Sequence, residues 1–319
     1  MNRRAFLIGS VAALTVPPRS ARALSPPITP KARVIVIGGG MGGATAAKYL
    51  RLWGDEVAVT LVERNAKYVS NIMSSLVLTG QQTIPNLTFS YDTLSSRYGV
   101  EVIIDDVAEV DPARVSVKLK SGKQLSADRI VMAPGIDFES VPGLDETRMP
   151  HAWKAGPQTV LLAKQLIGMP ENGVVVLTVP KAPYRCPPGP YERACLIADW
   201  LKTAKPRAKL ILLDANPDIA VEKDIFGRAF SGPYAQVIEY RSGVEVTSAD
   251  SAQMLLSTNA GQVRGDVINV IPPHRAGALV AASGLITGIN ERFAPVDVLS
   301  YGSKAAPNVH VVGDSCAST

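Results

Sequence analysis

The sequence predicts an α/β fold built from two dinucleotide-binding domains of the Rossmann type, and three observations support this prediction. First, 319 residues are enough for two ordinary domains, and a hydrophobic content of 46% is far too high for a disordered chain. Second, a short apolar run at 33–37 leads into a glycine-rich turn and a helical segment. Third, another apolar run at 173–179 is also followed by a loop and a helical segment. Short continuous apolar runs of this kind are typical of buried parallel strands.

The first 23 residues predict an export signal. Arg3 and Arg4 precede an apolar run that ends at Val16, and a small-x-small sequence ending at Ala23 follows. This arrangement is typical of a twin-arginine signal peptide, here 1–23, and it predicts a periplasmic protein. The alternative is a membrane anchor, but the run is only about half of the roughly 20 residues that span a bilayer. We therefore expect no stable membrane insertion.

Charge and cysteine content exclude several kinds of partner and site. Four arginines and no acidic residue fall in the signal, so the rest of the chain holds 29 basic residues against 28 acidic ones. This balance predicts no nucleic-acid partner. Three cysteines and three histidines are too few and too scattered for a disulfide framework or a zinc site, so we expect no metal. The sequence contains no CxxCH, so this chain itself carries no c-type haem.

The turn after the first strand matches a dinucleotide-binding pattern. Gly38, Gly40 and Gly43 follow the strand and open a helical segment, as GxGxxG requires. The first glycine permits a tight turn, the second lets the backbone approach a pyrophosphate, and the third lets the helix pack on the strand. A second strand at 57–62 leads to Glu63, where an acid can hold ribose hydroxyls. We therefore predict that these four residues bind a dinucleotide.

Two later segments favour FAD over NAD at this site. A strand at 129–132 ends in a small-residue turn with Ala133 and Gly135, and a strand near the end of the chain ends in Gly313 and Asp314. In two-domain flavoproteins such an aspartate accepts hydrogen bonds from the ribityl hydroxyls of the flavin, and it lies far along the chain because a second domain is inserted. We therefore expect these four residues to contact FAD.

The inserted domain begins with a suitable strand but lacks the glycines of a nucleotide site. The segment from Pro180 to Pro190 contains five prolines and one glycine, which cannot form the close backbone cradle that a pyrophosphate requires. We therefore expect that NADH and NADPH do not bind there. The predicted domain boundaries are 31–148 and 273–319 for the two parts of the FAD domain, and 149–272 for the insertion.

Of the three cysteines, Cys186 is the candidate for redox chemistry. It lies beside Arg185 and just before a helical segment at 190–203. A neighbouring cation and a helix N-terminus both favour a thiolate, so Cys186 is the predicted catalytic residue, and the alternative is a structural cysteine held by prolines. Cys195 falls among apolar helical residues and is expected in the core. Cys316 is expected to pack near the cofactor, and a disulfide between Cys186 and Cys316 is left open.

Four segments carry a resemblance to a known family. They are RCPPGPYER at 185–193, HAWKAG at 151–156, VINVIPPHRAG at 267–277 and APVD at 294–297. On these segments the chain resembles the flavoprotein subunit of flavocytochrome c sulfide dehydrogenase. The resemblance implies an enzyme of the FAD/NAD(P)-linked reductase type in which a cysteine pair captures sulfide and electrons pass to a separate c-type cytochrome subunit. It also implies that Cys186 is one of that pair and that FAD is held by Gly38, Gly40, Gly43, Glu63 and Asp314.

The chain departs from that family at two points. In members with covalently bound flavin, a cysteine after the second strand is linked to the 8α carbon of the flavin, and Asn71 takes its place here. A carboxamide nitrogen is not a comparable nucleophile, so the FAD beside Asn71 is expected to be non-covalent. The chain also ends at Thr319, soon after Asp314. We therefore expect the C-terminal domain, with the second redox cysteine, to be missing.

The expected function is periplasmic oxidation of sulfide to sulfur or polysulfide, with FAD as the cofactor and a c-type cytochrome subunit as the partner. A sulfide:quinone reductase is the alternative enzyme, because it shares the fold and the thiol chemistry. The export signal and the lack of an amphipathic membrane segment disfavour that alternative. A flavin-binding remnant without turnover is the third hypothesis, because the C-terminal domain is expected to be missing.

Overall fold

The computed structural model describes residues 29–288 and 291–317. Every helix and strand named below belongs to the unit formed by Lys31–Thr319. The predicted signal peptide, 1–23, lies outside the described residues. Among the helices that are described, none is both long enough and apolar enough to cross a membrane.

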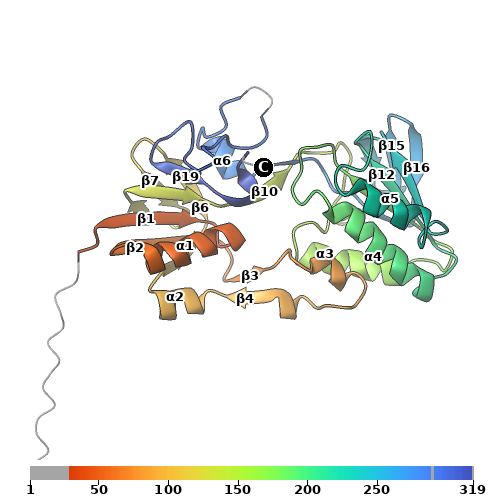
Figure 1. The fold of residues 1–319 in the computed structure, drawn as a ribbon, viewed down its shortest axis with the longest axis horizontal. Helices are drawn as coiled ribbons and strands as arrows, with labels where there is room; N and C mark the ends of the chain where they lie inside the picture. The colour runs from red at the N-terminus through yellow and green to blue at the C-terminus, as the bar shows by residue number, and fades with distance from the viewer. Residues whose placement is uncertain (1–28, 289–290, 318–319) are drawn as a thin grey trace, which may run out of the picture. The chain divides into compact units, whose positions relative to one another are not determined.

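The first sheet contains five parallel strands. Their order is β19 (Val309–Val311), β9 (Arg129–Met132), β1 (Ala32–Ile37), β2 (Val57–Glu63) and β5 (Glu101–Ile104). Helix α1 (Met41–Trp53) covers one face, and the antiparallel strands β6 (Val107–Asp111), β7 (Ser116–Leu119) and β8 (Gln124–Ser126) cover the other (Figure 1). In β1, Val34 and Val36 pack on the α1 side, and Ile35 and Ile37 pack on the β7 side. The strand is apolar throughout because both of its faces are buried.

The second sheet contains four parallel strands and is built in the same way. Their order is β13 (Ile238–Ser242), β12 (Lys209–Asp214), β11 (Val174–Val179) and β17 (Val267–Asn269). One face is covered by the helices α3 (Pro157–Gly168), α4 (Gly189–Ala204) and α5 (Lys223–Ser231). The other face packs on the antiparallel strands β14 (Val246–Asp250), β15 (Leu255–Thr258) and β16 (Gly261–Arg264). Alternate residues of β11 therefore enter two different cores, which explains its continuous apolar run.

The second sheet is inserted into the first. The chain leaves the first sheet after β9 and returns only at β19, where Val309 pairs with Ile130 of β9. Strands β10 (Ile136–Phe138) and β18 (His274–Ala276) pair antiparallel at the two crossings between the sheets. This arrangement confirms the predicted α/β fold with two Rossmann-like domains. The smaller elements are β3 (Lys67–Val69), η1 (Ser74–Val77), η2 (Pro85–Leu87), β4 (Thr88–Ser90), α2 (Asp92–Tyr98), α6 (Ala278–Ala282) and η3 (Gly313–Ser315).

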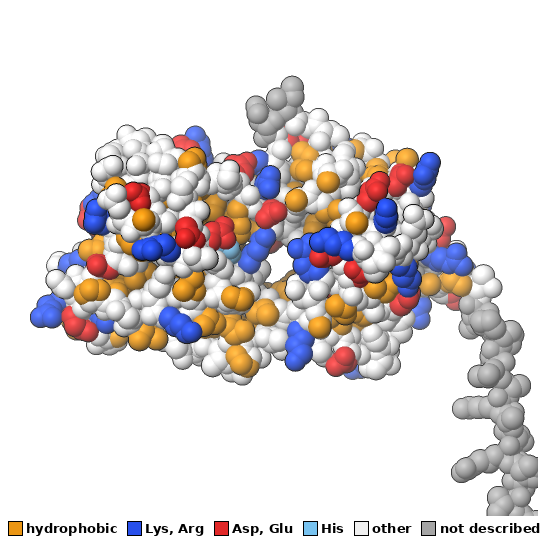
Figure 2. All heavy atoms as spheres, turned by 180° about the vertical axis from the view of Figure 1, so that it is seen from behind, with side chains coloured by type: hydrophobic (Ala, Val, Ile, Leu, Met, Phe, Trp, Pro, Cys, Tyr) orange, Lys and Arg blue, Asp and Glu red, His pale blue; other side chains and the backbone are white. Residues whose placement is uncertain are grey.

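Charges of both signs are mixed over the face shown in Figure 2. Lysine and arginine side chains alternate there with aspartate and glutamate, and apolar patches lie between them. This face therefore offers no continuous basic surface of the kind that binds a nucleic-acid backbone. The mixture agrees with the near-neutral composition of the chain beyond the predicted signal.

Candidate functional site

The first sheet brings the predicted FAD residues to one of its edges. Glu63 is the last residue of β2, and Gly38 and Ala133 directly follow β1 and β9. Gly313 comes two residues after the end of β19. Because these four strands are parallel neighbours, their carboxyl ends meet at the same edge. Ligands of open α/β sheets bind outside that edge.

Two positions of the turn between β1 and α1 require glycine. Gly38 has a φ of +98°, and a Cβ on it would lie 2.3 Å from the carbonyl oxygen of Ala133. A Cβ on Gly43 would lie 1.9 Å from the carbonyl oxygen of Gly38. At Gly40, by contrast, the nearest atom to an added Cβ would belong to Tyr68, at 3.9 Å. Gly38 and Gly43 permit close packing of the backbone, whereas Gly40 leaves its side of the turn open to a ligand.

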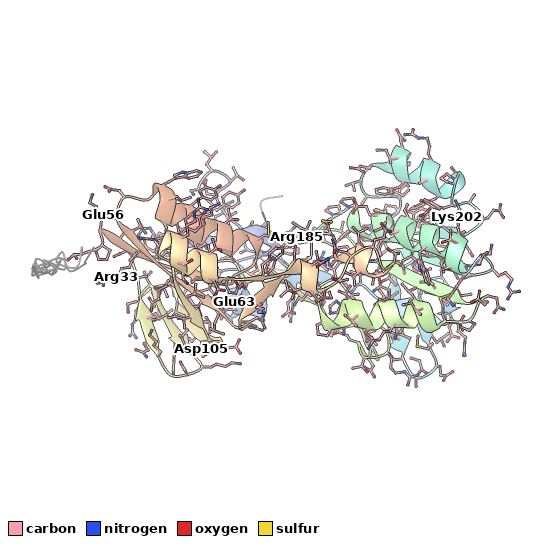
Figure 3. All side chains as sticks on the ribbon, turned by 90° about the horizontal axis from the view of Figure 1, so that it is seen from below. Arg33, Glu56, Glu63, Asp105, Arg185 and Lys202 are labelled. Atoms are coloured by element: carbon pink, nitrogen blue, oxygen red, sulfur yellow. The ribbon has the colours of Figure 1, made fainter. Side chains whose placement is uncertain are left out.

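The start of α1 has the donors and the acid that a dinucleotide needs. Gly40 precedes the helix without a side-chain hydrogen bond, and the first turn carries no acidic residue. The amide groups of that turn are therefore available to a phosphate. The carboxylate of Glu63 accepts hydrogen bonds from the backbone N–H groups of Gly39, at 2.7 Å, and Asn65, at 2.9 Å, which hold it beside the turn (Figure 3). The residues present thus fit the pyrophosphate and ribose of FAD.

The turn after β19 lies against the glycine turn. A Cβ on Gly42 would lie 3.5 Å from the Cα of Gly313, which itself has a φ of +69°. The hydroxyl of Ser315 donates a hydrogen bond to the carbonyl oxygen of Gly135, so the turns after β19 and β9 are joined as well. Asp314 is exposed at this junction. That Asp314 contacts the ribityl chain of FAD stays a prediction. The surface concerned is formed by the turns after β1, β9 and β19, which are distant from one another in the sequence.

Cys186 lies where the loop after β11 turns into α4. It has a φ of +57°, in the left-handed region that residues other than glycine rarely adopt, and it is exposed. Its carbonyl oxygen accepts a hydrogen bond from the N–H of Gly189, the first residue of α4, at 2.9 Å. A Cβ on Gly189 would lie 3.0 Å from the Cys186 sulfur and 2.6 Å from the ring of Trp153. Glycine at this position therefore makes room for both the sulfur and the indole.

Arg185 joins the cysteine loop to the first sheet. Its Nε donates a hydrogen bond to the carbonyl oxygen of Asp314 at 2.8 Å, and its Nη2 donates to that of Cys316. The guanidinium carbon lies 3.7 Å from the centre of the Phe293 ring. The buried Arg185 side chain thus occupies the place where the two sheets meet (Figure 3).

The sequence predicts a lowered pKa for the Cys186 thiol, and the structure contradicts that prediction. Desolvation by the surrounding protein, followed by the negative charge of Glu192, raises the pKa of this thiol, and Asp314 acts in the same direction. A hydrogen bond from the N–H of Gly189 lowers the pKa, as expected at a helix N-terminus, and so does the charge of Arg193. Sequence adjacency misidentified the cation, because the side chain of residue 185 is directed to the other sheet.

The other two cysteines are packed into cores. Cys195 is half-buried on α4, among the apolar residues between the helices and the second sheet, and burial raises the pKa of its thiol to about 11. Cys316 is buried in the core of the first sheet, and its sulfur lies 3.1 Å from the carbonyl oxygen of Gly313. Cys186 carries a free thiol in this structure, so no disulfide joins it to Cys316.

The carboxylate at the end of β12 in the second sheet is already occupied by hydrogen bonds within the protein. Asp214, the last residue of β12, corresponds in position to an acid that holds a ribose. It is fully buried, and its carboxylate accepts hydrogen bonds from the hydroxyls of Tyr191, at 2.7 Å, and Tyr240, at 2.9 Å, and from the N–H of Asn216, at 2.9 Å. The end of β12 therefore offers no available carboxylate to NADH or NADPH. Sequence analysis did not single out Asp214 or Tyr191.

Two buried histidines hold the backbone around the cysteine loop. The Nδ1 of His274 accepts a hydrogen bond from the N–H of Arg185 at 2.9 Å, and the Nδ1 of His151 accepts one from that of Trp153 at 2.9 Å. Burial, together with nearby positive charges, lowers the pKa of His274 to about 3 and that of His151 to about 4. Both rings are therefore neutral near pH 7. Within the described residues, no group of three or more His, Cys, Asp or Glu side chains has a geometry that could hold a metal ion.

Asn71 has a structural contact of its own. Its carboxamide oxygen accepts a hydrogen bond from the N–H of Ala155 at 2.7 Å, so it ties the segment after β3 to the HAWKAG segment. Its neighbours Ile72 and Met73 are exposed. That FAD is bound here without a covalent link stays a prediction.

Comparisons with known proteins agree with this architecture. The family model described as pyridine nucleotide-disulphide oxidoreductase matches residues 32–161, and the one described as the central part of the sulfide dehydrogenase [flavocytochrome c] flavoprotein chain matches 159–272. The mitochondrial sulfide:quinone oxidoreductase of Mus musculus is 26% identical over 308 residues, which cover 88% of this chain. The chain spans 65% of the length of that mouse protein.

Two further likenesses bear on the family. The sulfide dehydrogenase [flavocytochrome c] flavoprotein chain of Chlorobaculum thiosulfatiphilum is 49% identical over 45 residues, which are 14% of this chain and 94% of that sequence. The solved structure of the Aquifex aeolicus sulfide:quinone oxidoreductase shares the fold, with a TM-score of 0.76 at 20% identity over 89% of this chain and 68% of that one. The chain therefore belongs to the FAD-binding pyridine nucleotide-disulphide oxidoreductase family, and it contains the domain described as the central part of the sulfide dehydrogenase [flavocytochrome c] flavoprotein chain.

Proposed function

We propose that the protein oxidises sulfide with non-covalent FAD and that the Cys186 thiol is the point at which sulfur enters. The observation that carries this proposal is the link from the cysteine loop to the flavin-type turn. The guanidinium of Arg185 bonds to the backbone of Asp314 and Cys316. Cys186, the next residue, is thereby held beside the edge of the first sheet where FAD fits.

The chemistry of this arrangement is a two-electron oxidation of sulfur. The sulfur of a hydrosulfide ion joins the sulfur of Cys186, the protons of the hydrosulfide and of the thiol are released, and an electron pair leaves, so that Cys186 carries a persulfide anion. Bound FAD would supply the acceptor for that electron pair and the capacity to pass electrons singly to a haem protein. The residues of this chain supply the exposed thiol at Cys186, the phosphate-binding turn of α1 and the acids Glu63 and Asp314. Sulfur then leaves as elemental sulfur or polysulfide.

We propose a c-type cytochrome subunit as the electron acceptor and the periplasm as the location. The match of residues 159–272 to the flavocytochrome c central domain and the twin-arginine pattern of the first 23 residues support these assignments. The second candidate acceptor is a quinone, because the mouse and Aquifex aeolicus relatives named as sulfide:quinone oxidoreductases cover most of this chain. A flavin-binding protein without turnover is the third candidate.

One anaerobic titration tests the proposal. The protein is loaded with FAD and titrated with sulfide while the absorbance of the oxidised flavin is recorded, and we expect this absorbance to disappear. The reduced sample is then divided between oxidised cytochrome c and a short-chain ubiquinone. Return of the flavin absorbance with cytochrome alone supports the proposed acceptor, and return with quinone alone supports the second candidate. If sulfide leaves the flavin oxidised, the protein is the third candidate and the proposal is wrong.

A further inference from the structure

Arg193, on α4, is a buried cation whose hydrogen-bond partners are all neutral. Only 2% of the residue is exposed. Its guanidinium donates to the carbonyl oxygens of Ala152, at 2.8 Å, and His151, at 3.1 Å, to the Oδ1 of Asn269, at 2.9 Å, and to the hydroxyl of Ser75, at 3.2 Å. Among the described residues, no carboxylate forms an ion pair with it. A cation buried in this way is costly unless an anion compensates its charge.

Arg193 and the Cys186 sulfur lie on the same face of α4. Gly189 and Arg193 are four residues apart in α4, so they share one face of the helix, one turn apart. The sulfur rests on that face at Gly189, where a Cβ would approach it to 3.0 Å. Trp153 packs against the same two residues, because its ring would lie 2.6 Å from a Cβ on Gly189 and its centre is 4.9 Å from the guanidinium carbon of Arg193. Sulfur, indole and guanidinium therefore form one cluster.

We propose that Arg193 is a positioning residue whose buried charge stabilises anionic sulfur at Cys186, first the thiolate and then the persulfide formed by sulfide. This inference deepens the proposed function and rests on it for the persulfide, but the effect on the thiolate is a property of the protein alone. It also explains why a costly buried arginine has neutral partners. The anion that compensates Arg193 is the reacting sulfur, and a permanent carboxylate partner would cancel the charge that the sulfur needs.

The other groups that face the sulfur shift the pKa of the Cys186 thiol, some upward and some downward. Glu192 and Asp314 are negatively charged and raise the pKa of the Cys186 thiol, as desolvation does. The N–H of Gly189 and the charge of Arg193 lower that pKa. Tyr184, whose own pKa burial raises to about 12, is neutral near pH 7. Removal of Arg193 leaves desolvation and the two carboxylates opposed only by one N–H group, so the thiolate should become much less stable.

The test is the pH dependence of alkylation at each cysteine. Parent protein, Arg193→Met, Arg193→Gln and Arg193→Lys are treated with iodoacetamide over a range of pH, without sulfide, and the label at Cys186 and Cys195 is measured by mass spectrometry. In the two neutral variants we expect the midpoint for Cys186 to rise by about one pH unit, equivalent to roughly tenfold less thiolate below the midpoint. Arg193→Lys retains the charge and should keep a midpoint nearer to that of the parent.

Cys195 provides the internal control, because it lies on α4, just after Cys186. Burial and the charge of Glu192 raise the pKa of its thiol, and Arg193 is not among the causes. A purely structural role for Arg193 would alter labelling at both cysteines together. Two neutral variants are used because methionine suits the apolar surroundings whereas glutamine keeps hydrogen-bond donors, and either one that retains the parent circular dichroism spectrum is sufficient. An unchanged Cys186 midpoint in a folded neutral variant overturns the inference.

The outcome is independent of the test of the proposed function. If the parent protein is not reduced by sulfide but the Cys186 midpoint rises as expected, the proposed function is wrong and the role of Arg193 toward the thiolate stands. If sulfide reduces the flavin but the midpoint does not move, the proposed function stands and the role of Arg193 is wrong.

Discussion

The Nε of Arg185 donates a hydrogen bond to the carbonyl oxygen of Asp314, 2.8 Å away, and so joins residues that are 129 positions apart in the chain. Arg185 belongs to the loop after β11 of the second sheet, and Asp314 belongs to the turn after β19 of the first. The contact therefore couples the loop that carries Cys186 to the turn predicted to hold the ribityl chain of FAD. We therefore expect loss of this contact to disturb both the loop that carries Cys186 and the turn after β19.

We predict that Arg185→Lys weakens FAD binding and lowers thermal stability. An ammonium group cannot reach both the Asp314 and Cys316 carbonyl oxygens in the forked geometry of a guanidinium. The loss of one charged hydrogen bond costs about 1.5–3 kcal/mol, which corresponds to a fall in Tm of several degrees. Fluorescence titration with FAD and differential scanning calorimetry measure the two effects. Arg207→Lys, at an exposed position, is the matched control, and equal behaviour of the two variants would contradict the prediction.

We predict that Cys186→Ser abolishes reduction of the flavin by sulfide and leaves FAD bound. Serine has nearly the same size, but its hydroxyl is not ionised near neutral pH and cannot form a bond to sulfur of the kind proposed. Stopped-flow absorbance of the FAD-loaded protein after mixing with sulfide gives the rate. Cys195→Ser should keep the parent rate and cost only about 1–2 kcal/mol of stability, for a partly buried hydroxyl. Parental bleaching in Cys186→Ser would instead favour a structural cysteine held by prolines.

Alanine at two glycines of the phosphate turn should have different effects: one variant should lose stability, and the other should lose only affinity for FAD. A Cβ on Gly43 would lie 1.9 Å from the Gly38 carbonyl oxygen, so Gly43→Ala should destabilise the protein even without FAD. A Cβ on Gly40 would approach only Tyr68, at 3.9 Å, so Gly40→Ala should keep the Tm of the FAD-free protein but lose affinity for FAD. Scanning calorimetry with and without FAD separates the two. Full FAD affinity in a folded Gly40→Ala protein would show that the pyrophosphate lies elsewhere.

FAD should be released by acid. Asn71 replaces the cysteine that binds flavin covalently in some relatives, and its carboxamide oxygen already accepts the Ala155 N–H. After acid precipitation of the loaded protein we expect all of the flavin absorbance in the supernatant. Yellow colour in the washed pellet would reveal a covalent link that the residues around 71 do not predict.

NADH and NADPH should not reduce the flavin. The Pro180–Pro190 segment lacks the glycines of a pyrophosphate turn, and the Asp214 carboxylate is already bonded to the Tyr191 and Tyr240 hydroxyls. Anaerobic incubation of the FAD-loaded protein with millimolar NADH should therefore leave the oxidised flavin spectrum unchanged. Dithionite, added afterwards, is the positive control for a reducible flavin. Rapid bleaching by NADH would mean that Tyr191 moves away from Asp214.

Sequence alone was sufficient to predict the positions of candidate site residues that local chain geometry sets. Gly38, Gly40, Gly43 and Glu63 were predictable because a strand, a tight turn, a helix and a second strand fix their spacing, and the parallel sheet then brings their positions together. The sequence also shows that the segment after β11 lacks the glycines of a pyrophosphate-binding turn. Cys186 could be singled out because it precedes a helix, and the backbone N–H of Gly189 at the start of that helix does lower the pKa of its thiol, as the position predicts.

Only the tertiary structure decided which charges act on that cysteine. Arg185 is its neighbour in sequence, yet its guanidinium bonds to Asp314 and Cys316. The charge that lowers the pKa of the Cys186 thiol is that of Arg193, one helical turn beyond Gly189 in α4. Asp214 likewise has the position of a ribose-binding acid but is closed by Tyr191 and Tyr240. The physical reason is that two properties depend on burial and on partners from distant segments. They are the electrostatic potential at a thiol and the availability of a carboxylate to a ligand. Those partners become neighbours only when both sheets have formed and packed.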